Sequence, residues 1–218
     1  MDPRPATRFA YLHGFASGPA SHKGSALSAA FAARGAELAL PDLNRPSFAR
    51  LTVTGGLEAV AAWAGEDDAP VGLVGSSLGG YQAALWASRN PERVARLVLL
   101  CPGFELVARW PALLGAPAIA RWRAHGALAF ADASGAQVPV HWGFIEDALT
   151  LPQTPAVPCP TLILHGVADE VVPIETSRAY AAAHPERVRL VELDDDHALA
   201  RSVDRIGAET LAFFGLAG

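Results

Sequence analysis

Short runs of apolar residues alternate along the chain with longer segments rich in alanine and leucine. The runs contain few polar positions, which is typical of parallel strands that helices cover on both faces. The longer segments have the length of helices, so the alternation predicts βαβ units around a parallel sheet. The expected strands are residues 9–13, 36–40, 71–76, 94–100, 161–165 and 188–193. The expected helices are residues 19–34, 56–63, 78–88, 175–183 and 198–214.

The alternation stops between residues 103 and 158, an interval rich in proline, arginine and tryptophan. A stretch of this length without a place in the sheet predicts an insertion with its own short helices. The chain has 218 residues, the size of one α/β domain. We therefore expect a single domain over residues 1–218 that contains a cap insertion at 103–158.

Composition narrows the class of protein and its partners. Hydrophobic residues make up 51% and charged residues 18% of the chain, which predicts a packed interior and not disorder. The formal net charge of −5 makes nucleic acid an unfavourable partner. We expect no signal peptide and no membrane span. Cys101 and Cys159 flank successive strands, too far apart for a disulfide, so we expect a reduced, cytoplasmic protein.

The strongest chemical signal is Gly75-Ser76-Ser77-Leu78-Gly79. It matches G-x-S-x-G with Ser77 at the centre, directly after an expected strand and directly before an expected helix, which is the setting of a nucleophilic serine. A nucleophile on such a turn has a strained backbone, and small flanking residues relieve the crowding. The alternative is a glycine-rich turn that carries an incidental serine.

The segments YLHGF and GLVGSSLGG resemble the α/β-hydrolase superfamily, and in particular the small bacterial YqiA-like esterases. The resemblance implies the α/β-hydrolase fold, with a mostly parallel, doubly wound sheet of about six strands and a helical cap insertion. It also implies a catalytic triad in the chain order serine, acid, histidine, with the acid and the histidine on loops after later strands.

Asp169 fits the acid of that order, because it lies in a G-x-x-D-x-x-V-P segment after the strand at 161–165. Glu170 and Glu105 are the alternatives, and an aspartate that caps the following helix is the non-catalytic interpretation. His197 fits the base, since it alone among seven histidines follows the last expected strand. The non-catalytic interpretation of His197 is a surface-loop histidine. The aspartates at 194–196 are expected to be solvated.

The expected mechanism is acyl transfer, in which His197 moves the Ser77 proton and Asp169 fixes the imidazole tautomer. The Leu78 N–H would provide one oxyanion donor, and the resemblance points to the Phe15 N–H as the other. We expect no cofactor and no metal, because the sequence has no phosphate loop, dinucleotide fingerprint or cluster of metal ligands.

Trp110, Trp122, Trp142 and Phe144 in the insertion predict an apolar wall at the substrate site. The alternative is that these aromatic residues only pack the insertion against the domain. Arg109 is either a surface arginine or a contact for an anionic substrate group. The resulting hypothesis is a serine hydrolase of small, apolar carboxylic esters, with thioesters as a further class. The alternatives are a C–C hydrolase or lyase of the same fold and a non-catalytic binding protein. The sequence leaves the oligomeric state open.

Overall fold

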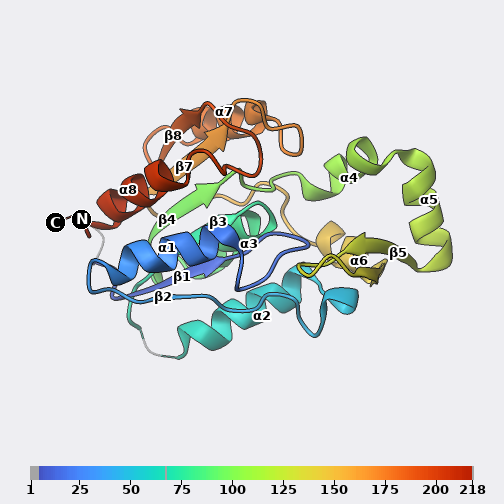
Figure 1. Ribbon diagram of the computed structural model, residues 1–218, viewed down its shortest axis with the longest axis horizontal. Coiled ribbons are helices and arrows are strands. Elements are labelled where there is room, and N and C mark those ends of the chain that lie inside the picture. The colour runs from blue at the N-terminus through green and yellow to red at the C-terminus, as the bar shows by residue number, and fades with distance from the viewer. Residues whose placement is uncertain (1–4, 67, 218) are drawn as a thin grey trace.

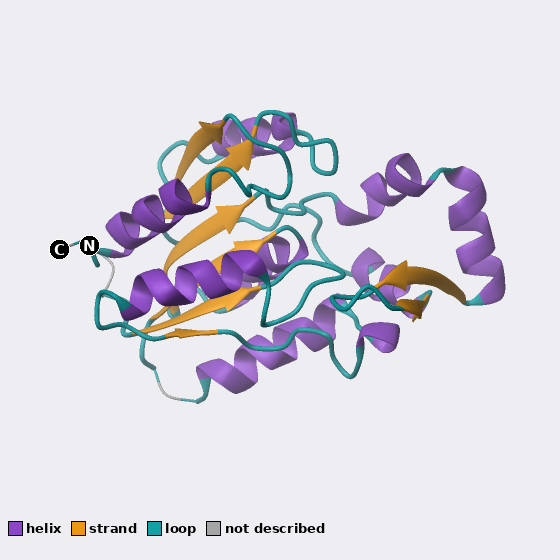
Figure 2. Ribbon diagram, in the orientation of Figure 1, coloured by secondary structure: helices purple, strands orange, loops and turns teal. Residues whose placement is uncertain are grey.

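The computed structural model describes residues 5–66 and 68–217, which form a central sheet of six strands (Figures 1 and 2). The strand order is β2-β1-β3-β4-β7-β8, and every neighbouring pair is parallel. The strands are β1 (Arg8–Leu12), β2 (Leu38–Ala39), β3 (Val71–Ser76), β4 (Val94–Leu100), β7 (Thr161–Gly166) and β8 (Val188–Leu193). The predicted parallel sheet of about six strands is confirmed.

Helices cover both faces of this sheet. Side chains from α1 and α8 form one apolar layer with Phe9 and Tyr11 of β1. Side chains from α2, α3 and α7 form the other layer with Ala10 and Leu12, so the sheet is doubly wound and both of its faces are buried. The helices are α1 (His22–Ala32), α2 (Val53–Ala64), α3 (Leu78–Arg89), α7 (Ile174–Ala183) and α8 (Val203–Phe214), and a short 3₁₀ helix, η1, spans Phe48–Arg50.

Three helices begin three or more residues from their expected positions, and the first of them, α1, begins at His22 and not at residue 19. The α2 helix begins at Val53, before its glycine pair, because the Thr52 hydroxyl caps it by accepting a hydrogen bond from Gly55 N at 2.9 Å. The α8 helix begins at Val203, and not at residue 198. Residues 198–202 belong instead to a loop that leads into the helix.

The inserted segment, residues 103–158, contains a β-hairpin that the sequence pattern did not predict, in addition to the expected short helices. Its two strands are antiparallel. Asp132 N donates to Ala136 O at 2.9 Å across the turn, and Gly135 has a φ of 85° there. The elements are α4 (Leu106–Leu114), α5 (Ala116–His125), β5 (Ala127–Ala131), β6 (Gln137–His141) and α6 (Gly143–Leu149), which together extend to one side of the sheet in Figure 1.

Apolar and polar contacts join the inserted segment to the rest of the protein. Its buried side chains, including Trp122, belong to the same cluster as the core on the α2–α3 face of the sheet. The Trp122 indole N–H donates to Val140 O at 2.8 Å. The Asp147 carboxylate accepts a hydrogen bond from Thr54 N at 2.9 Å, which ties α6 to α2. In the described part of the chain, no helix is long and apolar enough to cross a membrane.

Replacement of Trp122 by alanine tests the packing of the inserted segment. Trp122 is fully buried, so Trp122→Ala should lower the free energy of unfolding by about 3–5 kcal/mol. Leu149→Ala is the matched control, because Leu149 is 62% exposed and its loss should cost less than about 0.5 kcal/mol. Urea unfolding measures both changes. Similar losses for the two variants would contradict the prediction.

Candidate active site

Three loops meet beyond the carboxyl ends of the parallel strands. Ser77 directly follows β3, Asp169 lies in the loop after β7, and His197 lies in the loop after β8. Only β4 separates β3 from β7 in the sheet, and β8 is the next neighbour of β7. The three side chains therefore reach the same edge of the sheet, where open α/β proteins place their ligands.

Ser77 occupies the sharp turn between β3 and α3. Its φ of 53° and ψ of −117° lie in a region that side chains other than glycine rarely adopt, so the turn is strained. Gly79 permits this turn, because a Cβ atom there would lie 2.1 Å from the Leu12 carbonyl oxygen. The first turn of α3 can consequently pack directly against β1, and the Ser77 hydroxyl projects from the turn toward His197.

A chain of two hydrogen bonds joins the three side chains. His197 Nδ1 lies 2.7 Å from Asp169 Oδ2, and His197 Nε2 lies 3.1 Å from Ser77 Oγ. Because an ionised carboxylate only accepts, the proton of the neutral imidazole belongs on Nδ1. Nε2 is then free to accept the Ser77 hydroxyl proton, so the arrangement can activate Ser77 as a nucleophile.

Asp169 is buried and surrounded by donors. Burial by itself would raise the pKa of Asp169, but hydrogen bonds from His165, His197 and Val172 outweigh this effect and hold the pKa far below its usual range. Val171 N and Val172 N donate to Oδ1 at 2.9 and 2.7 Å. The carboxylate is therefore ionised and fixed in orientation. Glu170 and Glu105, the alternative acids, are both exposed.

His165 supports Asp169 from the interior of the protein. It is completely buried, and its Nε2 lies 2.8 Å from Val172 O and 3.2 Å from Asp169 Oδ2. Both of these oxygens accept, so Nε2 carries the proton, and Nδ1 accepts from the Ser177 hydroxyl at 2.8 Å. His165 is thus a donor to the carboxylate.

One aspartate before His197 differs from its expected environment. Asp195 is 1% exposed, whereas a solvated position was expected. Its carboxylate accepts hydrogen bonds from Ser202 N and Asp196 N, each at 2.9 Å. Although burial alone would raise the pKa of Asp195, these backbone and side-chain hydrogen bonds lower it. Asp195 therefore stabilises the loop from inside as an ionised acceptor.

The two expected oxyanion donors, the N–H groups of Leu78 and Phe15, belong to segments that lie next to Ser77. Leu78 is the first residue of α3, so its N–H has no partner within the helix, and the positive end of the helix dipole adds to it. A Cβ atom on Gly14 would lie 3.3 Å from Ser77 Cβ, which shows how closely the Gly14-Phe15 loop approaches the nucleophile. His13 holds this loop, because its Nε2 accepts from Leu43 N at 3.0 Å and its Nδ1–H can donate to Gly14 O at 3.0 Å.

Aromatic side chains surround the ring of Phe15. Its centroid lies 5.1 Å from those of Trp110 and Phe130 and 5.5 Å from that of Phe144. Trp122 and Trp142 lie one layer farther out, since Trp122 packs on Trp110 at 5.4 Å and on Trp142 at 5.6 Å. Of the four predicted wall residues, Trp110 and Phe144 therefore contact the Phe15 ring, while Trp122 and Trp142 pack behind Trp110.

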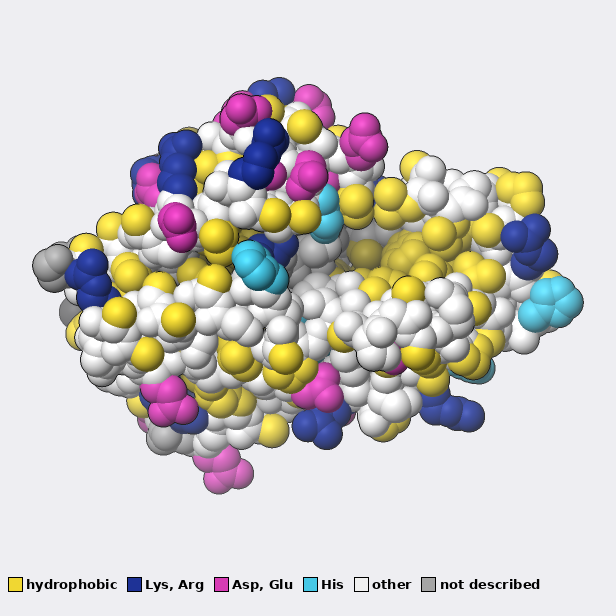
Figure 3. All heavy atoms as spheres, viewed as in Figure 1, with side chains coloured by type: hydrophobic (Ala, Val, Ile, Leu, Met, Phe, Trp, Pro, Cys, Tyr) yellow, Lys and Arg dark blue, Asp and Glu magenta, His cyan; other side chains and the backbone are white. Residues whose placement is uncertain are grey.

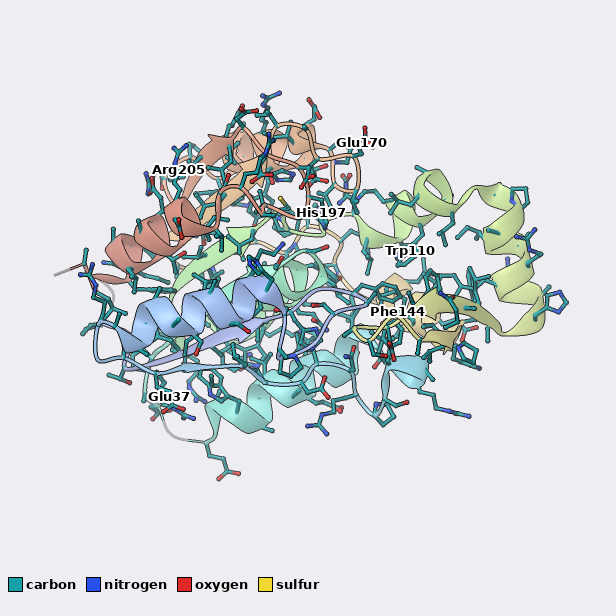
Figure 4. All side chains as sticks on the ribbon, in the orientation of Figure 1. Glu37, Trp110, Phe144, Glu170, His197 and Arg205 are labelled. Atoms are coloured by element: carbon teal, nitrogen blue, oxygen red, sulfur yellow. The ribbon has the colours of Figure 1, made fainter. Side chains whose placement is uncertain are left out.

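Hydrophobic side chains gather in a hollow between the sheet and the inserted segment (Figure 3). His197 lies on the sheet side of this region, and Trp110 and Phe144 lie on the side of the inserted segment (Figure 4). A second hollow of about 550 Å³ opens beside His197 and is lined by Ala168, Glu170, Val171, Asp196, His197 and Ala198. His197 thus has open space next to it.

Arg109 is engaged in contacts within the protein. Its guanidinium donates to Thr176 Oγ1 at 3.2 Å and to the Phe104 carbonyl. These bonds tie α4 to the N-terminal end of α7. Arg109 therefore acts as a structural contact in this arrangement and not as a free charge for an anionic substrate.

Cys101, Asp169 and His197 have side-chain atoms of the kinds that bind metals, and these atoms lie within 4.8 Å of one another. Among the described residues, no other group of this kind occurs. Burial raises the pKa of the Cys101 thiol, and the negative charge of Asp169 raises it further. The thiol is therefore protonated, whereas a metal needs the thiolate. Asp169 and His197 are already bonded to each other, so these residues do not favour a metal centre.

Sequence reasoning missed several residues at this site. Phe130 and Phe48 pack on the Phe15 ring, and the alternation in ALAFA, followed by the turn DASG, was the signal for a strand that carries Phe130. Asp195 gave no sequence signal that distinguishes it from its two neighbours. Lys23, whose Nζ lies 2.8 Å from Ala198 O, stands out in the sequence as the only lysine among 17 basic residues, but this skew by itself is typical of codon bias and indicates no role.

Solved structures with the same fold span nearly the whole chain. Alpha/beta hydrolase domain-containing protein 10 from mouse is 21% identical, with a TM-score of 0.76 and coverage of 99% of this chain and 92% of its own. Est1E from Butyrivibrio proteoclasticus is 20% identical, with a TM-score of 0.67 and coverage of 97% and 88%. The monoacylglycerol lipase of Paleococcus ferrophilus is 14% identical, with a TM-score of 0.72 and coverage of 99% and 97%. At these identities the similarity establishes the α/β-hydrolase fold.

The sequence comparisons give one family. No curated protein matches the chain, but the model of the uncharacterised protein family UPF0227 matches residues 8–214. This match covers nearly all of the chain and confirms the resemblance to YqiA-like proteins. The chain therefore belongs to the UPF0227 family and has the α/β-hydrolase fold.

Proposed function

We propose that the protein is a serine hydrolase that cleaves carboxylic esters through an acyl-enzyme, with Ser77 as nucleophile, His197 as general base and Asp169 as the orienting acid. The observation that carries this proposal is the chain of hydrogen bonds from Asp169 to His197 at 2.7 Å and from His197 to Ser77 at 3.1 Å. Nucleophile, base and orienting group within hydrogen-bond reach are the geometric signature of nucleophilic catalysis.

In the first half-reaction the Ser77 oxygen attacks the ester carbonyl carbon while His197 Nε2 takes the hydroxyl proton. The N–H groups of Leu78 and Phe15 stabilise the negative charge on the carbonyl oxygen. The tetrahedral intermediate then breaks its bond to the alcohol oxygen, and His197 gives that oxygen the proton. Throughout, Asp169 stabilises the imidazolium and keeps the ring in orientation.

In the second half-reaction a water molecule attacks the acyl-enzyme. His197 removes a proton from this water as the new C–O bond forms, and the same two N–H groups stabilise the oxyanion. Collapse of the intermediate breaks the bond to Ser77 and releases the carboxylic acid. His197 returns the proton to Ser77 Oγ, so the enzyme is regenerated without any cofactor.

Residues 103–158 act in this proposal as a cap within a single domain, and the hollow in Figure 3 holds the apolar part of the substrate. In this proposal the protonated alcohol leaves into the space beside His197, the residue that gives it the proton. Arg109 is occupied by Thr176 and the Phe104 carbonyl, which favours esters with uncharged acyl groups. Cys101 and Cys159 are unpaired and buried, in keeping with a proposed location in the reducing cytoplasm.

Ser77→Ala tests the nucleophile. The wild-type protein should react covalently with a fluorophosphonate probe and hydrolyse p-nitrophenyl esters, and Ser77→Ala should abolish labelling and lower kcat by roughly three orders of magnitude or more. Ser76→Ala is the matched control, because Ser76 precedes the turn and should leave labelling in place. Folded wild-type protein that shows neither labelling nor turnover would refute the proposal and favour a binding protein.

Asp169→Asn tests the orienting acid. An amide in place of the carboxylate favours the wrong imidazole tautomer, so kcat should fall by about 10³–10⁴-fold while the protein remains folded. Glu170→Gln, one residue away and exposed, should change kcat less than twofold. Steady-state kinetics measures both variants, and equal losses would show that Asp169 does not have the proposed role.

Asp169 should also make stability depend on pH. Its pKa in the folded protein lies below the value of about 3.9 for an unfolded aspartate. The ionised carboxylate therefore stabilises the folded state fully above about pH 4 and progressively less as the pH falls toward the folded pKa. Urea unfolding at a series of pH values should show a gap between wild type and Asp169→Asn that narrows below about pH 4. A gap of constant size would contradict this expectation.

A further inference from the structure

The loop that carries His197 has no regular secondary structure and must be held by its contacts. Asp195 anchors the loop before His197 through Ser202 N and Asp196 N. In addition, Ala168 N donates to Asp195 O at 3.0 Å, which joins this loop to the loop of Asp169. Because Ser202 follows His197, the Asp195 carboxylate spans the loop, and Ala198 N also donates to Asp196 Oδ1 at 2.8 Å. These bonds engage main-chain N–H groups of the loop, so the carbonyl oxygens of His197 and Ala198 are a separate point at which the loop can be held.

Lys23 contacts the carbonyl oxygens of the loop at His197 and directly after it. It lies in the first turn of α1, and its Nζ is 2.8 Å from Ala198 O and 3.5 Å from His197 O. The ammonium thus approaches the carbonyl oxygens of the base itself and of the residue that follows it. Leu199, the next residue, is buried with a φ of 54°, so the chain turns sharply directly after this contact.

The position of Lys23 does not serve the helix that contains it. A cation in the first turn of a helix is disfavoured by the helix dipole. Burial lowers the pKa of Lys23, and the nearby negative groups, which include Asp169, Asp195 and Asp196, only partly offset this effect. The chain has 17 basic residues, and Lys23 is the only lysine among them. A compact ammonium can approach two neighbouring carbonyl oxygens, whereas a guanidinium presents a rigid, planar fork.

We propose that Lys23 is a positioning residue that holds the His197 loop so that the imidazole stays between Ser77 and Asp169. This inference rests on the proposed hydrolase function. Lys23 touches no reacting atom and acts through the main chain of His197 and Ala198. Together, Asp195, which spans the loop, and Lys23, which holds two of its carbonyl oxygens, fix the main chain around His197.

A misplacement of about 1 Å at a catalytic group can reduce the rate about 100-fold. Lys23→Met keeps the length of the side chain but removes the charge and the donors. We expect kcat to fall tenfold to 100-fold, with KM within twofold of wild type, since Lys23 contacts no substrate. The rate of labelling by the fluorophosphonate should fall in parallel, because it also requires activation of Ser77.

The experiment compares Lys23→Met with His22→Met, an exposed neighbour on the same helix that should retain wild-type kcat. Lys23→Arg keeps a cation and N–H donors and should retain more activity than Lys23→Met. The proton NMR resonance of the His197 Nδ1–H provides a direct readout: it should be sharp and far downfield in the wild type and in His22→Met, and broadened in Lys23→Met. Thermal unfolding establishes that each variant is folded at the assay temperature.

A kcat for folded Lys23→Met within twofold of wild type, or an activity equal to or above that of Lys23→Arg, would overturn the proposal. If Lys23→Met does not fold, Lys23→Gln carries the same test, and a kcat at least fivefold below wild type at unchanged KM is expected. Absence of turnover and labelling in the wild type would instead refute the hydrolase function. An active wild type with an equally active Lys23→Gln would refute only the role of Lys23.

Discussion

The hydrogen bond between His197 and Asp169 is the contact on which the site depends, because it joins two loops that leave different strands. β7 and β8 are neighbours in parallel register, so their carboxyl ends place the two loops side by side. Gly166 permits the close approach, since a Cβ atom there would lie 2.4 Å from Asp195 O. The sheet therefore brings the loops of His197 and Asp169 close together, and contacts within the loops determine the final distance between the two side chains.

The proposed nucleophile imposes a second constraint, which is the strained backbone of Ser77. Such a conformation persists only where the surroundings determine it fully. Here β3, the first turn of α3 and the loop after β4 all contact the turn, and Gly103 N donates to Ser77 O at 2.8 Å. Gly103 is also the first residue of the inserted segment. The start of that segment consequently helps to hold the turn that carries the nucleophile.

The sequence predicted those parts of the structure that depend on local pattern. The strands followed from apolar runs, and the positions of Ser77, Asp169 and His197 followed from a motif and from chain order. Features that depend on tertiary contacts were not predictable in this way. Asp195 cannot be distinguished from Asp194 and Asp196 by sequence, because only the folded loop buries it. The Gly55-Gly56 pair disfavours a helix, so the start of α2 at Val53 follows only from the hydrogen bond to the Thr52 cap. Phe130 lies in a hairpin strand whose alternation, in ALAFA, is a weak signal because three of its five residues are alanine.

Phe15 belongs to two environments that are usually separate. Its backbone N–H is an oxyanion donor in the proposed mechanism, and its ring packs among Trp110, Phe130 and Phe144. Any group that displaces or tightens this ring also moves the main chain of the same residue. If Phe15 has its proposed role, a ligand in the aromatic cluster would affect the polarisation of the scissile carbonyl through this one residue. Selectivity and rate acceleration would then share one mechanical link, so a change in one cannot be fully independent of the other.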